Sequence, residues 1–271
     1  MIKVILVIEI TQNQLHHFIK IILLHQFLHD SVKKLLGIVR IDNFRVHNDK
    51  CLLEKIQKRT LDHVVKKGNI PDTSFYNKWY GRGRWVFSTI YSNSIGQGEV
   101  EVVPLQMANL ACIVANRGFF YTPHLVRYYG PDSTKNPEFY VKHDTGIERR
   151  YFDIAVRGMY DVVHGAGGTA HKADIPGIDV CGKTGTAENY GNDHSVFIAF
   201  APKDDPKIAV AVYVENAQGG GGTWAAPIAS LIIEKYIRGE VQRKDFEKYY
   251  IDVNPCQKLP LTRRIKKPKK R

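Results

Sequence analysis

Two apolar stretches, residues 195–201 and 208–215, constrain the fold most strongly. They flank the polar turn 202–206, which begins and ends with proline, and this arrangement predicts a β-hairpin. Both faces of each stretch are apolar, which indicates strands in the interior of a sheet that is covered on both sides. A further strand is expected at 178–182.

Three helices are expected around these strands, at residues 104–116, 148–163 and 224–238. The first begins at a proline and ends before an Arg-Gly pair, and it is apolar nearly all round, so we expect it to be buried. Residues 67–71 are expected to form a turn, which leads into an aromatic loop over residues 79–85.

The formal net charge of +12 would by itself suggest nucleic acid or an anionic membrane as a partner. The excess lies at the two ends, because residues 1–66 carry 11 Lys and Arg against 6 Asp and Glu, and residues 257–271 carry 8 against none. Residues 67–256 carry 20 against 21 and are electrically balanced. Nucleic acid is therefore not expected as a partner, and residues 241–271 are interpreted as a polar, basic tail.

Residues 1–66 differ in composition from the rest of the chain. They contain no Ala, Pro, Tyr or Trp, a single glycine and six of the eleven histidines. One interpretation is a basic amphipathic helix, because Leu15, Phe18, Ile19 and Ile22 recur at helical spacing. The other is a non-native segment, as after a shifted reading frame or a truncated gene start. We expect neither a membrane span nor a signal peptide here, because the apolar runs are short and interrupted by charge.

The four cysteines are too few and too scattered for a disulfide scaffold or a CxxC metal site. His164 and His171 flank a glycine-rich turn, and no carboxylate or cysteine lies at a spacing that would complete a zinc site with them. Both histidines are therefore interpreted as loop-capping or surface residues, and Cys181 as a small buried strand residue. No metal or organic cofactor is expected.

The most specific string in the sequence is GKTGTAE at residues 182–188. A glycine five positions earlier also satisfies the pattern GxxxxGKT of a phosphate-binding P-loop over Gly177–Thr184. A P-loop needs a loop before the lysine and a helix after it, whereas residues 178–181 look like a strand and Gly185 would interrupt a helix. Nucleotide binding at these residues is the remote alternative.

Acyl transfer is the competing chemistry, because a KTG triplet marks the strand at the edge of the pocket in penicillin-recognising serine enzymes. The ammonium of Lys183 supplies positive charge for a substrate carboxylate and for proton transfer, and threonine hydroxyls can hold that carboxylate directly. Gly185 lets a substrate lie close along the strand and pair with its free backbone groups. A backbone N–H after this glycine could stabilise a tetrahedral oxyanion.

Four ordered stretches resemble the C-terminal part of class B penicillin-binding proteins, and within that family the penicillin-binding protein 2 branch of elongation-specific peptidoglycan D,D-transpeptidases. They are YSNSIGQGEVEVVPLQMANLACIVANRGFFYTPHLV (91–126), GGTAHKADIPGIDVCGKTGTAEN (167–189), HSVFIAFAPKDDPKIAVAVYVEN (194–216) and AAPIASLIIEKYI (225–237). The resemblance covers residues 67–240 and implies an α+β fold of the penicillin-binding-protein and β-lactamase-like type. In this fold an antiparallel sheet carries the KTGT strand and helices pack on it. Residues 67–240 would be an incomplete, C-terminal part of that domain.

The resemblance also assigns roles to single residues. Lys183 would support proton transfer and anion binding, and Thr184 and Thr186 would bind the carboxylate of the substrate or of a β-lactam. Gly185 would belong to the same substrate-binding set, and the amide of Thr186 would complete the oxyanion hole. Ser94, in the stretch SIGQG, corresponds to a turn before a helix and not to a nucleophile.

The family's nucleophile lies in an SxxK motif on a helix, and an SxN motif completes the proton network. No SxN triplet precedes the SIGQG stretch. The string from Ser31 to Lys34 has the SxxK pattern, but it lacks the family's surrounding residues and lies closer to KTGT than the family's arrangement would place it. Ser31 with Lys34 is therefore a weak candidate, and a fragment without the nucleophile is the favoured interpretation.

The reaction implied for the whole domain is attack by a serine on the penultimate D-Ala carbonyl of a peptidoglycan stem peptide, followed by transfer of the acyl group to a neighbouring amine. The implied partners are peptidoglycan stem peptides, β-lactam antibiotics and other cell-elongation proteins. The implied location is the periplasmic face of the bacterial inner membrane. The alternative is a non-catalytic module that binds peptidoglycan or a partner through the KTGT edge.

Overall fold

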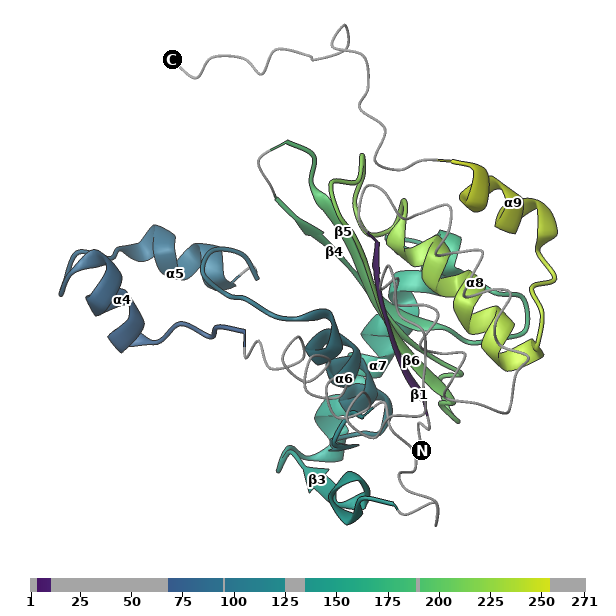
Figure 1. Ribbon diagram of the computed structural model, residues 1–271, viewed down its shortest axis with the longest axis horizontal. Helices are drawn as coiled ribbons and strands as arrows, with labels where there is room; N and C mark the ends of the chain where they lie inside the picture. The colour runs from purple at the N-terminus through teal and green to yellow at the C-terminus, as the bar shows by residue number, and fades with distance from the viewer. Residues whose placement is uncertain (1–3, 11–67, 95, 125–134, 189–190, 254–271) are drawn as a thin grey trace, which may run out of the picture.

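The computed structural model describes residues 4–10, 68–94, 96–124, 135–188 and 191–253. Its main feature is a four-stranded sheet with helices on both faces (Figure 1). A two-stranded sheet and a pair of short helices complete the described part of the chain.

The main sheet has the strand order β1-β6-β5-β4. The bounds are β1 Val4–Ile10, β4 Cys181–Ala187, β5 His194–Ala201 and β6 Ile208–Val214. β4, β5 and β6 are antiparallel to one another, and the expected hairpin is β5 followed by β6. β1 pairs with β6 in parallel, so a strand from the compositionally distinct segment 1–66 extends the expected antiparallel sheet.

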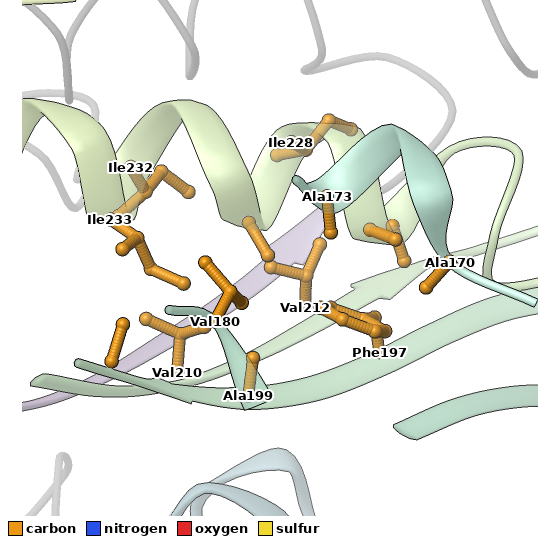
Figure 2. Close-up of a cluster of buried hydrophobic side chains, with 14 of the residues drawn as sticks. Ala170, Ala173, Val180, Phe197, Ala199, Val210, Val212, Ile228, Ile232 and Ile233 are labelled. Carbon is orange, nitrogen blue, oxygen red and sulfur yellow. The ribbon is translucent and has the colours of Figure 1, made fainter. Parts of the chain in front are cut away.

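Helix α8 (Ala225–Arg238) covers one face of the sheet, as expected from the sequence. Figure 2 shows Ile228 and Ile232 of this helix above Val210 and Val212 of β6, and all four side chains are buried. Because helices contact β6 on both faces of the sheet, its side chains are apolar on both faces.

Helices α6 (Pro104–Ala115) and α7 (Arg149–His164) cover the other face. Their shared core with the sheet comprises Ala111, Cys112, Ala115, Val156, Met159, Cys181, Phe200 and Ala209. The prediction that α6 is buried all round was wrong at Leu110, whose side chain is 52% exposed. No described element packs over that side of the helix.

Two short helices, α4 (Thr73–Tyr80) and α5 (Phe87–Ser94), flank the expected aromatic loop, of which residues 79 and 80 end α4 and residues 81–85 lie outside both helices. Asp72 begins α4 by accepting a hydrogen bond from the backbone N–H of Phe75 at 2.7 Å. Tyr76 is buried and donates a hydrogen bond to Glu99 at 3.1 Å. The sequence analysis thus identified the loop but missed the helices on either side of it, and both helices project away from the sheet (Figure 1).

The remaining elements are β2 (Phe119–Tyr121), β3 (Lys142–Asp144), the 3-10 helices η1 (Pro137–Tyr140) and η2 (His171–Ala173), and α9 (Lys244–Asp252). α9 lies inside the stretch 241–271 that composition indicated only as polar. It packs Tyr250 edge-on against Trp224, with ring centroids 6.0 Å apart. Among the residues described, no helix is both long enough and apolar enough to cross a membrane.

Candidate active site

The KTGT residues lie within β4, the strand at the edge of the main sheet. The strand expected at 178–182 begins only at Cys181 and continues to Ala187, so the prediction placed it too early and ended it too soon. Two glycines in the motif lower its strand propensity, and pairing with β5 overrides that preference. On the side away from β5 no described strand pairs with β4, and alternate backbone N–H and C=O groups are open there to a substrate backbone.

The lysine and the two threonines of the motif lie on opposite faces of β4. Thr184 pairs with Phe197, which belongs to the core beneath α8. Because successive side chains of a strand alternate, Thr184 and Thr186 share this face and Lys183 lies on the other. Lys183 is exposed, and its ammonium donates a hydrogen bond to the C=O of Thr184 at 2.7 Å. A carboxylate at the strand edge would thus have a positive charge on one side and hydroxyls on the other.

A third threonine joins this site from another segment. Thr169, in the turn between α7 and η2, places its Oγ1 2.8 Å from Oγ1 of Thr184. Thr169 was not among the residues expected from the sequence. The signal that could have found it is its place in the stretch 167–189, which also carries the KTGT motif.

The glycines at 219–222 form a loop that packs against the motif strand. A Cβ added to Gly220 would lie 2.6 Å from Oγ1 of Thr186, and one added to Gly221 would lie 2.9 Å from both N and O of Gly185. Real Cβ atoms do not approach other atoms so closely, so Gly221, which meets backbone atoms, requires glycine, and a side chain at Gly220 would displace the hydroxyl of Thr186. The loop thus supports the centre of the motif.

Ser195 anchors this glycine loop to the sheet. Its fully buried hydroxyl donates a hydrogen bond to the C=O of Gly220 at 2.9 Å and accepts one from the N–H of Ala225 at 3.1 Å. Ser195 is also the β5 partner of Thr186. One hydroxyl therefore ties the motif strand, the glycine loop and the start of α8 together, which makes Ser195 a structural residue and not a nucleophile.

The two histidines of the glycine-rich turn contact backbone carbonyls. A ring nitrogen of His164 lies 3.2 Å from the C=O of Val180, and one of His171 lies 3.0 Å from the C=O of Val163. They thus hold the segment before β4 against the end of α7, in keeping with a loop-capping role. In the described ranges no group of three or more His, Cys, Asp or Glu residues is placed to hold a metal ion.

Neither Ser94 nor Cys181, both of which the structure describes, is a nucleophile at this site. Ser31 and Lys34 lie outside the described residues. Ser94 ends α5 and donates a hydrogen bond to the C=O of Tyr91 at 2.8 Å. Cys181 is fully buried, and burial raises the pKa of its thiol to about 12, so it is a packing residue.

The geometry of Gly177–Thr184 is not that of a P-loop. Gly182 and Thr184 pair with β5 as strand residues, and β4 continues for three residues beyond Thr184 where a P-loop would begin a helix. Successive N–H groups of a strand point to opposite sides and cannot wrap a phosphate. The nucleotide alternative was therefore wrong.

Residues 55–234 match the family described as Penicillin binding protein transpeptidase domain. The chain belongs to this family. The peptidoglycan D,D-transpeptidase MrdA of Haemophilus influenzae is 34% identical to this penicillin-binding protein over 211 residues, which are 70% of the chain and 32% of MrdA. The match begins before residue 67, where the change in composition had suggested that the domain begins.

Solved structures give the same assignment. The Pseudomonas aeruginosa PBP2 chain crystallised with WCK 5153 is 30% identical with a TM-score of 0.55, over 65% of this chain and 39% of that one. The Helicobacter pylori PBP2–MreC complex contains a similar chain, which is 25% identical with a TM-score of 0.54. The match covers 63% of this chain and 31% of that one. The predicted penicillin-binding protein 2 branch and the predicted α+β fold are confirmed. The chain spans about a third of the length of MrdA and of the H. pylori protein.

Proposed function

We propose that this chain supplies the substrate-binding strand of a peptidoglycan D,D-transpeptidase that acts in cell-wall elongation and so in maintaining cell shape. The observation that carries the proposal is the position of the KTGT motif on an open sheet edge, with an exposed Lys183 on one face and threonine hydroxyls on the other. A relative of the same family, MrdA, is named for this activity.

The open edge of β4 suits an extended stem peptide that ends in D-Ala-D-Ala. Its backbone would pair with the free N–H and C=O groups of the strand. Its terminal carboxylate would accept hydrogen bonds from Thr184 and Thr186 and would be attracted by the ammonium of Lys183. Gly185, which carries no side chain, lets the peptide lie close to the strand.

The reaction follows from this binding mode. A serine attacks the penultimate D-Ala carbonyl, and the amide N–H of Thr186 stabilises the oxyanion by about 3 kcal/mol. The bond to the terminal D-Ala then breaks and D-Ala leaves with a proton, which gives an acyl-enzyme. An amine of a neighbouring stem peptide attacks the ester, forms the cross-link and releases the serine. A β-lactam would acylate the same serine through ring opening.

Partners and location are part of the same proposal. PBP2 of Helicobacter pylori forms a complex with MreC. We infer that this chain likewise works with a cell-elongation protein, at the periplasmic face of the bacterial inner membrane. Both inferences rest on the shared family and on the kind of substrate, since peptidoglycan is built outside that membrane.

Fluorescence anisotropy of a fluorescent penicillin tests the proposal. We expect saturable binding that N-acetyl-D-alanyl-D-alanine displaces and that Lys183→Met abolishes, because that change removes the charge while keeping most of the length of the side chain. Binding that persists in Lys183→Met, or that the peptide does not displace, would contradict the proposal.

Ser31 is tested on the same samples after denaturation on a gel. A fluorescent band that Ser31→Ala removes would assign Ser31 as the nucleophile. Reversible binding without any band would mean that the chain supplies the binding strand alone.

A further inference from the structure

The hydroxyls of Thr169 and Thr184 form a hydrogen-bonded pair at the motif strand. Their Oγ1 atoms are 2.8 Å apart, although the residues are separated by 15 positions in sequence. Thr169 is exposed and Thr184 is half-buried, so the pair lies at the surface of the site. Among the described residues, no other group forms a hydrogen bond with the hydroxyl of Thr184.

The backbone around Thr169 is fixed from several sides. The N–H of Gly168 donates to the C=O of Gly165 at 2.8 Å, and the N–H of Ala170 donates to the C=O of Val162 at 2.9 Å. A Cβ added to Gly222 would lie 2.0 Å from the carbonyl oxygen of Thr169, so the glycine loop packs directly against this residue. The same loop contacts the centre of β4, and it therefore sets the position of Thr169 relative to the motif strand.

The chemistry of two paired hydroxyls determines what the pair can offer to a ligand. Each threonine hydroxyl has one proton and two acceptor lone pairs. One of the two protons lies between the oxygens, which leaves a single O–H donor free. A hydroxyl that already accepts a hydrogen bond is polarised and becomes a better donor. The pair thus presents one oriented, strengthened donor, which suits an anionic oxygen better than a neutral amide.

We infer that Thr169 is a positioning residue of the carboxylate subsite: its hydroxyl orients that of Thr184 toward the terminal carboxylate of the bound peptide. This inference rests on the proposed function, because it names a residue of the same site. It goes beyond the KTGT motif in that a residue from the turn after α7 sets the preference for a free carboxylate over a blocked terminus.

The test compares two ligands that differ only at this terminus, N-acetyl-D-alanyl-D-alanine and its C-terminal amide. Their dissociation constants are measured on the whole chain by following ligand-induced NMR shifts to saturation. The unsubstituted chain is expected to prefer the carboxylate. In Thr169→Val this preference falls about tenfold, the size of one hydrogen bond to a charged group. In Thr169→Ser, which keeps the hydroxyl, it returns.

The ratio of the two affinities separates a loss of hydroxyl orientation from a loss of folding, because a purely structural defect would weaken the binding of both ligands alike. The matched control is Thr145→Val, which removes a threonine hydrogen bond of the same length, 2.8 Å to the C=O of Gly118, at the β2–β3 sheet. This control leaves the ratio unchanged. An unchanged ratio in Thr169→Val would overturn the role of Thr169 alone. Equal binding of both ligands by the unsubstituted chain would overturn the proposed function and the inference with it.

Discussion

The ring of Phe197 on β5 lies directly against Gly182 on β4, one residue before the KTGT lysine. A Cβ added to Gly182 would lie 2.2 Å from Cζ of that ring, and Phe197 is completely buried. Since no side chain fits between the two, the ring contacts the backbone of the motif strand and sets the position of β4 over the core.

Gly182→Ala is expected to lower the free energy of unfolding by about 1 to 3 kcal/mol, because the added methyl must displace a packed aromatic ring. Chemical denaturation measures this loss. Gly158→Ala in α7 is the matched control: that glycine has open space around it, and alanine there should raise stability by about 0.5 to 1 kcal/mol. Phe197→Leu should reduce the cost of Gly182→Ala, and strictly additive effects of the two changes would refute the contact.

Among the residues whose burial the structure describes, Glu234 on α8 is the one charged residue that is completely buried. It accepts hydrogen bonds from Arg238 at 3.0 Å and from Arg243 at 2.8 Å. Arg243 also donates to the C=O of Asp174 at 3.1 Å. The carboxylate therefore connects α8 to the segment that leads into β4.

Glu234→Ala is expected to destabilise the chain by about 3 kcal/mol, because it leaves two guanidinium groups without their carboxylate partner in a largely buried site. Thermal or urea unfolding measures the change. Glu148→Ala breaks an exposed pair with Arg150, at 3.0 Å, and should cost less than about 1 kcal/mol. Equal losses in the two variants would show that the buried network contributes nothing beyond a surface pair.

Two buried thiols make stability sensitive to alkaline pH. Burial raises the pKa of Cys112 to about 11 and that of Cys181 to about 12, from an ordinary value of 9.0, because the thiolate is poorly solvated inside the protein. The unfolded chain therefore loses these protons first. The protonated thiols contribute fully to the free energy of unfolding below about pH 9. This contribution declines as the pH rises from there through the pKa values of the folded chain, by about 1.4 kcal/mol per pH unit for each thiol.

Urea unfolding between about pH 8 and pH 11 measures this slope, and Cys112→Ala with Cys181→Ala is expected to reduce it. In a Cys51→Ser, Cys256→Ser background, a thiol reagent should leave the folded chain unmodified near neutral pH and modify two thiols after unfolding. Rapid modification of the folded chain would mean that these thiols are accessible.

Helix α5 carries an apolar stripe that no described element covers. Phe87, Ile90 and Tyr91 stand at helical spacing and are 78%, 51% and 57% exposed. We expect the chain to self-associate or aggregate as its concentration rises, and Phe87→Glu with Ile90→Lys to reduce this association. Analytical ultracentrifugation measures it. Ile154→Lys, at an exposed position of α7, is the control with a smaller expected effect, and a monodisperse parent chain would contradict the prediction.

The sequence was most informative where one periodic pattern persists over a whole element. The β5–β6 hairpin and the helices α6, α7 and α8 lie within a few residues of their predicted bounds. α4 and α5 were missed because aromatic residues favour strands and are only moderate helix formers, so tertiary contacts such as that of Tyr76 with Glu99 decide. β1 was missed because a parallel partner distant in sequence leaves no local pattern.

The site was predictable only where it coincides with a motif. Lys183, Thr184, Gly185 and Thr186 were identified because their spacing is itself the signal. Thr169 depends on a hydrogen bond across 15 residues and on glycines about 50 residues further along, so the fold alone brings it to the motif.

NMR shift mapping on methyl-labelled threonine tests the central claim most directly, because threonines lie both in the site and far from it. On addition of N-acetyl-D-alanyl-D-alanine we expect the methyl signals of Thr169, Thr184 and Thr186 to move together, with one dissociation constant. Those of Thr122 and Thr145, near the β2–β3 sheet, should stay in place. Shifts that appear with ATP but not with the peptide, or peptide shifts confined to the distant threonines, would contradict the assignment of the KTGT edge as the substrate site.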